Sequence, residues 1–189
     1  MGTNQMQYIT SYASPIGEIT LASDGSCLIG LWLVGQRYFA ATLVEPREEK
    51  ALDVFSQTKL WLDIYFSGKR PDFMPPVALS GSPFRRVVWQ ELLDIPYGQT
   101  ATYGEIAARV AAKTNAAKVA PRAVGGAVGR NPVSIIVPCH RVIGADGNLV
   151  GYAGGLKTKK YLLELEGVTV TASKNFSIGK VARDVFYLW

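Results

Sequence analysis

"NPVSIIVPCHRVIG", residues 131–144, sets Cys139, one of two cysteines in the chain, directly before His140, its only histidine. The residues between Pro132 and Pro138 are apolar and β-branched apart from one serine, and this composition predicts a buried strand. Because proline donates no backbone hydrogen bond, the strand should end at Pro138. We therefore expect the thiol and the imidazole to stand together at the end of a buried strand.

The pairing of a thiol with an imidazole indicates nucleophilic chemistry. A thiol with an unperturbed pKa of roughly 8.5 reacts well only as a thiolate, and histidine is the best base near neutral pH. Adjacent side chains seldom point at each other, so a relay between Cys139 and His140 needs a turn or a bridging water. The alternative is that Cys139 is an inert buried residue, as we expect for Cys27, and that His140 is a hydrogen-bonded core histidine.

The composition of the chain narrows the class of protein. The chain has 189 residues, of which 48% are hydrophobic and 19% charged, which is typical of one large or two small globular domains. It has no apolar run of the roughly 18 residues that span a bilayer, and its first residues do not resemble a secretory signal. Two cysteines and one histidine are too few for a zinc site made of these residues alone. We expect a cytoplasmic protein without a metal.

Positive charge gathers in the second half of the chain. Residues 1–80 contain six Lys/Arg and eight Asp/Glu, whereas residues 81–166 contain eleven and six. A basic half suits a polyanion such as DNA. A solvated basic surface without a partner is the alternative, and charge alone favours it.

The first half predicts a small sheet and one helix. Residues 7–34 alternate apolar and polar positions between turn signals, which predicts two or three antiparallel strands. Within residues 48–68 apolar side chains recur at helical spacing, and Gly68 is a plausible stop. Prolines crowd residues 69–83, where we expect an extended linker.

The second half predicts short helices. Ser82 and Pro83 form a helix start, and Thr102 with Glu105 form a capping box. Residues 118–130 predict a further short helix that carries small side chains and an early cation, Arg122. Two short helices joined by a turn permit a helix-turn-helix. Glycine in a helix costs about 1 kcal/mol relative to alanine, which makes sense if another backbone, of protein or of nucleic acid, approaches closely.

These motifs together resemble one family. The segment "PCHRVIG", preceded by "RAVGGAVGRNPVSIIV" and followed by "GYAGGLKTKKYLLELEG", closely resembles the O6-alkylguanine-DNA alkyltransferases, the methylated-DNA–protein-cysteine methyltransferases. The likeness runs without a large gap from about Ser82 to Glu166. The first half resembles the N-terminal domain of the family more loosely.

The resemblance implies a two-domain α/β fold. Residues 1–75 would form an N-terminal α/β roll with a small antiparallel sheet, and residues 76–81 the linker. Residues 82–167 would form a mainly helical, winged helix-turn-helix domain that binds DNA and carries the catalytic site. Residues 168–189 would be a C-terminal extension, where Val181, Val185 and Leu188 suggest one face of a short helix.

The resemblance also implies catalytic roles. Cys139 would accept the alkyl group, His140 would act as its base through a bound water, and Glu166 would orient the imidazole. Asn131 would hold the turn that places the cysteine. Tyr103 would donate a proton to the guanine ring as the alkyl group leaves.

The same resemblance implies a DNA surface and a substrate pocket. Arg122 would enter the duplex and fill the gap left by an extruded nucleotide, while the small-residue helix would lie in the minor groove. The carbonyls of Cys139 and Val142 would recognise the guanine amino group. The implied DNA-contacting residues are Arg122, Ala123, Gly125, Gly126, Ala127 and Arg130, and the implied pocket residues are Val142, Tyr152, Ala153 and Gly154.

The implied function is DNA repair by an irreversible, single-turnover transfer to Cys139 from O6-alkylguanine, and also from O4-alkylthymine, in double-stranded DNA. We expect a monomer that uses no cofactor and has no membrane partner; cooperative binding to DNA is left open. One alternative is a module that recognises alkylated DNA without transfer, but such relatives replace the cysteine. Another is a cysteine hydrolase or a redox sensor, and a sensor would want a resolving cysteine nearer than Cys27.

Overall fold

In the computed structural model, residues 6–171 and 177–178 are described. The N-terminal half is a four-stranded sheet in the order β3-β2-β1-β4. The predicted antiparallel strands are confirmed as a meander. A fourth strand, which the sequence did not predict, pairs in parallel with β1 and makes the sheet mixed. The strands are β1 (Gln7–Ser14), β2 (Gly17–Ser23), β3 (Leu28–Leu33) and β4 (Arg47–Glu49).

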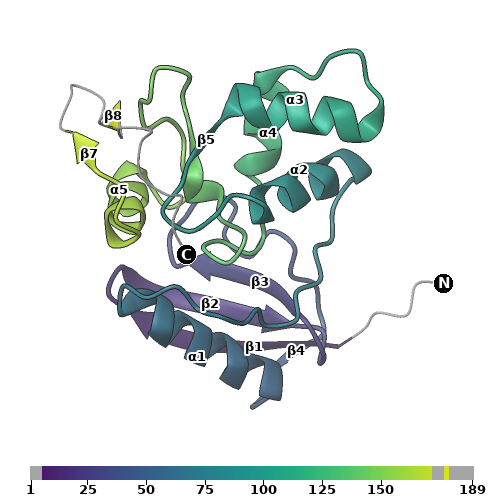
Figure 1. Cartoon of the computed structure of the whole chain (residues 1–189). Coiled ribbons are helices and arrows are strands. Elements are labelled where there is room, and N and C mark those ends of the chain that lie inside the picture. The colour runs from purple at the N-terminus through teal and green to yellow at the C-terminus, as the bar shows by residue number, and fades with distance from the viewer. Residues whose placement is uncertain (1–5, 172–176, 179–189) are drawn as a thin grey trace.

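The predicted helix of the first half is α1 (Asp53–Phe66), which lies against the sheet (Figure 1). Its buried face includes Phe55, Leu62 and Tyr65. The helix ends just before Gly68, whose φ of 79° is a left-handed conformation that favours glycine. Residues 69–82 then run without a helix, as the prolines predicted.

The C-terminal half is mainly helical, as predicted. Ser82 accepts a hydrogen bond from the Arg85 backbone at the start of its first helix, and Thr102 and Glu105 form the predicted capping box. Residues 115–120 join α3 and α4, the two helices of the predicted helix-turn-helix. Both lie with α2 on the side of the molecule opposite α1 (Figure 1). The elements are α2 (Pro83–Leu93), β5 (Ala101–Thr102), α3 (Tyr103–Thr114), α4 (Pro121–Val128), β6 (Val142–Ile143) and α5 (Leu156–Leu165).

The predicted strand before Pro138 is wrong, although its burial is right. Residues 133–137 are all buried, but they form one isolated bridge, from Val133 to Leu31, and then turn. The Val137 amide donates to the Val133 carbonyl. The Asn131 side-chain amide donates to the carbonyls of Val133 and Val137. Together with two hydrogen bonds to Leu31 of β3, these local bonds pair backbone groups of the segment without a continuous strand.

The two halves share one core. The edge of β3 exchanges hydrogen bonds with residues 132–134, and a single cluster of buried apolar side chains draws on both halves. Beyond α5, β7 (Val170–Thr171) pairs with β8 (Ser177–Ile178). The suggested helical face of Val181, Val185 and Leu188 lies outside the described residues. Of the described helices, none is long and apolar enough to cross a membrane.

Candidate active site

Cys139 lies in a short 3-10 turn, Cys139–Arg141, directly after the buried segment. Its side chain is buried, and the Asn131 side-chain amide donates to its Sγ over 3.2 Å. The same amide donates to the Val137 carbonyl over 2.8 Å, so one buried side chain holds both the turn and the sulfur. The structure thus brings Asn131 and Cys139 together, as the resemblance implied.

Glu166 is the centre of a buried hydrogen-bond network. Its carboxylate lies 2.6 Å from His140 Nε2 and accepts two hydrogen bonds from Arg141, of 2.8 and 3.0 Å. It also accepts from the Tyr65 hydroxyl and from the Gly98 amide. Burial raises the pKa of Glu166, but the hydrogen bonds and charges of His140 and Arg141 outweigh burial and bring the pKa to about 2. Glu166 is therefore ionised at neutral pH.

The network engages one ring nitrogen of His140 and leaves the other without a partner among the described residues. Burial lowers its pKa below the ordinary value, and the charges of Arg141 and Lys159 lower it further against the opposing effect of Glu166. A neutral imidazole has one proton, and the hydrogen bond to the carboxylate assigns that proton to Nε2. Nδ1 is buried and has no hydrogen-bond partner within residues 6–171 and 177–178. Its lone pair is therefore available to accept a proton.

The thiol needs such a base. Burial raises the pKa of Cys139, and the hydrogen bond from Asn131 and the charge of Lys159 offset this only in part. Lys159 is fully buried and donates to the carbonyls of Val142, Val150 and Gly151. The resting site is therefore a protonated thiol beside a neutral imidazole and a buried ammonium group.

A cavity of about 500 Å³ opens onto Cys139. Tyr103 lines it and donates to the Val150 carbonyl over 3.1 Å; burial and the nearby Cys139 raise the pKa of Tyr103 to about 12. Tyr152 and Ala153 also line it, as the resemblance implied. The full lining comprises Arg37, Tyr38, Tyr103, Arg122, Gly125, Gly126, Val128, Gly129, Arg130, Cys139, Gly151, Tyr152 and Ala153.

Val142 and Gly154, which the resemblance implied as pocket residues, are not among the residues that line the Cys139 cavity. Val142 follows the 3-10 turn, and its carbonyl is bound by Lys159. Gly154 backs onto Tyr152: a Cβ at this glycine would stand 3.0 Å from the tyrosine ring. Gly154 therefore leaves room for Tyr152 and does not itself line the cavity.

The small residues of α4 face two ways. Gly125 lies against the Tyr103 ring, where a Cβ would stand 3.6 Å from the nearest ring atom. Ala127 is buried, and its carbonyl accepts from the Trp89 indole, so its side chain is not on the outer face that the resemblance implied. Arg122, Ala123 and Gly126 are exposed, as is Arg130 just beyond the helix.

Sequence reasoning missed several of these groups. Tyr65, which comes from α1 of the other half, binds Glu166, and Lys159 is a buried cation without a carboxylate partner among the described side chains. Arg37 and Tyr38 lie on the loop after β3 and line the cavity. Only three-dimensional contacts reveal them.

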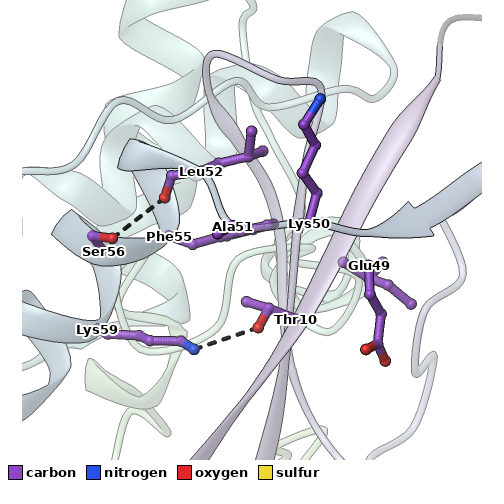
Figure 2. A pocket seen from close by; sticks show the side chains of 9 residues that line it. Thr10, Glu49, Lys50, Ala51, Leu52, Phe55, Ser56 and Lys59 are labelled. Atoms are coloured by element: carbon purple, nitrogen blue, oxygen red, sulfur yellow. Dashed lines mark hydrogen bonds between the residues drawn. The ribbon is translucent and has the colours of Figure 1, made fainter.

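A second cavity, of about 340 Å³, lies between α1 and strands β1 and β4. Figure 2 shows Lys59 reaching across it to the Thr10 hydroxyl, over 3.4 Å, while Glu49 and Lys50 point apart. It shares no lining residue with the Cys139 cavity. Within the described part of the chain, no cluster of His, Cys, Asp and Glu is suited to hold a metal ion.

Comparison with known proteins points to one family. Residues 83–168 match the family described as 6-O-methylguanine DNA methyltransferase, DNA binding domain, and residues 7–79 match its ribonuclease-like domain. The chain is 47% identical over 168 residues to a methylated-DNA–protein-cysteine methyltransferase of Mycobacterium leprae, covering 89% of this chain and 97% of the relative. It is 41% identical to the protein of that name in Haemophilus influenzae, covering 85% and 87%.

Solved structures agree. The crystal structure of Mycobacterium tuberculosis O6-methylguanine methyltransferase superposes with a TM-score of 0.72 at 45% identity, covering 85% of this chain and 93% of that one. A Mycobacterium tuberculosis OGT in complex with DNA superposes with a TM-score of 0.73 at 43% identity, covering 85% and 92%. The predicted combination of an N-terminal sheet domain and a helical C-terminal domain is thus confirmed. The chain belongs to the methylated-DNA–protein-cysteine methyltransferase family.

Proposed function

We propose that this protein repairs O6-alkylguanine, and also O4-alkylthymine, in double-stranded DNA by moving the alkyl group onto Cys139 in one irreversible turnover. The observation that carries the proposal is the buried thiol on a cavity, next to a neutral histidine whose Nε2 is engaged by an ionised Glu166. That arrangement supplies a nucleophile, the thiol, and a proton acceptor, the imidazole. The cavity gives room for the alkylated nucleobase.

The reaction begins at the thiol. The His140 Nδ1 lone pair takes the Cys139 proton through one water, and Glu166 stabilises the imidazolium that forms. The thiolate then attacks the alkyl carbon, an S–C bond forms, and the C–O6 bond breaks with its electron pair moving into the guanine ring. The carbonyls of Cys139 and Val142 already accept one hydrogen bond each, from the Val142 amide and from Lys159. Each would accept the guanine amino group through its second lone pair and so orient the base.

Tyr103 completes the proton balance. Its hydroxyl is protonated at neutral pH and can donate to the ring as negative charge develops there; the pKa of about 12 makes it a weaker acid than a free tyrosine, so the transfer depends on that charge. Tyr103 regains its proton from the imidazolium through solvent, and the net result is that the thiol proton ends on a neutral guanine. The thioether at Cys139 is a poor leaving group, so the protein is consumed.

The substrate must be extruded from the duplex, which costs a few kcal/mol. The outer face of α4 offers small side chains at Ala123 and Gly126 for close approach, and a Cβ at Gly126 would meet nothing within 4 Å in the protein. Arg122 is exposed on the same helix, and in this proposal its side chain would fill the gap in the duplex. We infer that the protein acts as a monomer in the cytoplasm, where it meets DNA.

A module that only recognises alkylated DNA would need neither the thiol nor the base. Stoichiometry separates the two functions: with excess duplex carrying O6-methylguanine, repair should stop after about one equivalent per protein. Cys139→Ser should bind the duplex and transfer nothing, while Cys27→Ser should react normally. Repair through many equivalents, or transfer by Cys139→Ser, would contradict the proposal.

A further inference from the structure

The loop after β3, residues 35–43, leaves the N-terminal sheet and attaches to the catalytic half at three places. The Gln36 side-chain oxygen lies 3.5 Å from the Ser134 hydroxyl, just before the catalytic turn. The Arg37 amide donates to the Ala153 carbonyl over 3.0 Å, on the cavity wall. The Tyr38 ring lies 4.9 Å from the Arg130 guanidinium carbon, at the end of α4.

The backbone of this loop is held in a demanding conformation. Tyr38 and Ala40 have φ values of 61° and 52°, a left-handed region that non-glycine residues rarely adopt. Turn hydrogen bonds join the amide of Phe39 to the carbonyl of Gln36 and the amide of Ala41 to the carbonyl of Tyr38. These hydrogen bonds support the loop in this conformation, which places Arg37 and Tyr38 on the cavity that Cys139 also lines.

The cavity carries positive charge without a counterion. The guanidinium carbons of Arg37 and Arg130 lie 4.8 and 4.9 Å from the centre of the same Tyr38 ring, and Arg122 lines the same cavity. No carboxylate in residues 6–171 or 177–178 forms a salt bridge with any of the three. Like charges gathered on one ring repel each other, and an anion bound between them would relieve the repulsion.

A phosphodiester is the anion whose position fits. A nucleotide whose base reaches Cys139 brings its own phosphates to the opening of the cavity, because base and phosphate belong to one nucleotide. The planar guanidinium matches phosphate oxygens with two parallel hydrogen bonds. Contact with the Tyr38 ring restrains where each guanidinium lies before the anion binds.

We propose that Arg37 and Arg130, whose guanidinium groups both lie over the Tyr38 ring, bind the phosphodiester backbone beside the extruded nucleotide, so that the N-terminal loop completes the DNA site. This inference rests on the proposed function, because it needs a nucleotide in the cavity. If the arginines at Tyr38 bind an acidic peptide in preference to DNA, the proposal is wrong.

The test compares Arg37→Ala and Tyr38→Leu with a matched control, Arg47→Ala. Arg47 is also an exposed arginine of the N-terminal half, but it lies on β4 and contacts only the exposed Glu45 among the salt bridges of the described residues. Two rates are measured for each protein: methyl transfer from a duplex with one O6-methylguanine, and alkyl transfer from a free O6-alkylated guanine base. The duplex rate is measured over a series of salt concentrations.

The Arg37→Ala variant should lose about tenfold more of its rate on the duplex than on the free base. The slope of log affinity against log salt concentration for duplex binding should also become shallower, by an amount that corresponds to about one phosphate contact. Tyr38→Leu should shift both readouts in the same direction, and Arg47→Ala should match the unmodified protein.

An equal loss on both substrates, or an unchanged salt dependence, would overturn the inference, and tighter binding of an acidic peptide than of the duplex would do the same. The two proposals fail separately. If the unmodified protein transfers no methyl group from the duplex, the proposed function fails. If it does transfer and Arg37→Ala behaves as the unmodified protein does, the loop alone is wrong.

Discussion

Replacing Glu166 by glutamine tests the buried network through stability. Glutamine keeps the shape of the side chain but removes the charge that His140 and Arg141 hold. Each pKa unit corresponds to about 1.4 kcal/mol, so a pKa that falls from 4.5 to about 2 sets an upper bound on the order of 3 kcal/mol on the stabilisation. The part that comes from the charge of His140 is absent at neutral pH, where the imidazole is neutral. Loss of the charge also leaves the Arg141 guanidinium buried without its counterion.

The sign of the pH dependence follows from the lowered pKa. A carboxyl group whose pKa is lowered by folding stabilises the protein above its unfolded pKa, and this stabilisation disappears as the pH falls from about 4.5 to about 2. Other carboxyl groups titrate in the same range, but they do so equally in Glu166→Gln. The difference in unfolding free energy between the two proteins should therefore be largest at neutral pH and shrink in acid.

The assay is denaturant unfolding of DNA-free protein, followed by tryptophan fluorescence, at neutral pH and at several acidic values. We expect Glu166→Gln to unfold at lower denaturant at neutral pH, with the two curves converging in acid. A constant gap between the proteins at every pH would mean that Glu166 is not held ionised by the fold, and the reasoning would be refuted.

Three further predictions concern the reaction. Arg122→Ala should slow repair of duplex DNA far more than reaction with a free alkylated base, which needs no extrusion; equal losses, measured by single-turnover rates, would remove this role. His140→Ala and Glu166→Ala should each slow transfer, and the double variant should be little slower than the slower single one, because residues that act as a unit are not additive; additive losses would separate them. Burial lowers the pKa of Lys159 to about 8, so its ammonium charge favours the Cys139 thiolate mainly below that pH; Lys159→Met should therefore slow labelling of Cys139 by a thiol-reactive probe at neutral pH more than at alkaline pH, and an equal rate at neutral pH would count against this electrostatic role.

Local signals in the sequence predicted the elements that local chemistry decides. The helix starts at Ser82 and Thr102 are set by side chains within one turn, so they were read correctly. β4 has three exposed residues and no alternation, so it left no pattern to read. The apolar segment at residues 133–137 showed that burial and strand formation are separate properties, because it pairs with β3 only at Val133 and Asn131 binds two of its carbonyls.

Much of the site was accessible from the motif around Cys139, because the thiol, its base and Asn131 lie close together in sequence. Tyr65 was not accessible: it lies 75 positions before His140, and only the packing of α1 on the catalytic half brings it to Glu166. Arg37 and Tyr38 were hidden for the same reason. Long-range contacts leave no periodic signal, so side chains that reach a site from another domain appear only in the structure.

The most direct test of the account locates the transferred group. The protein is reacted with a duplex whose O6-methylguanine carries an isotopically labelled methyl group, and the digested protein is analysed by mass spectrometry. The account predicts one labelled methyl group on the peptide that contains Cys139 and none on the peptide that contains Cys27. Consumption of the methylated base with the label on Cys27, or with no label on the protein, would contradict it.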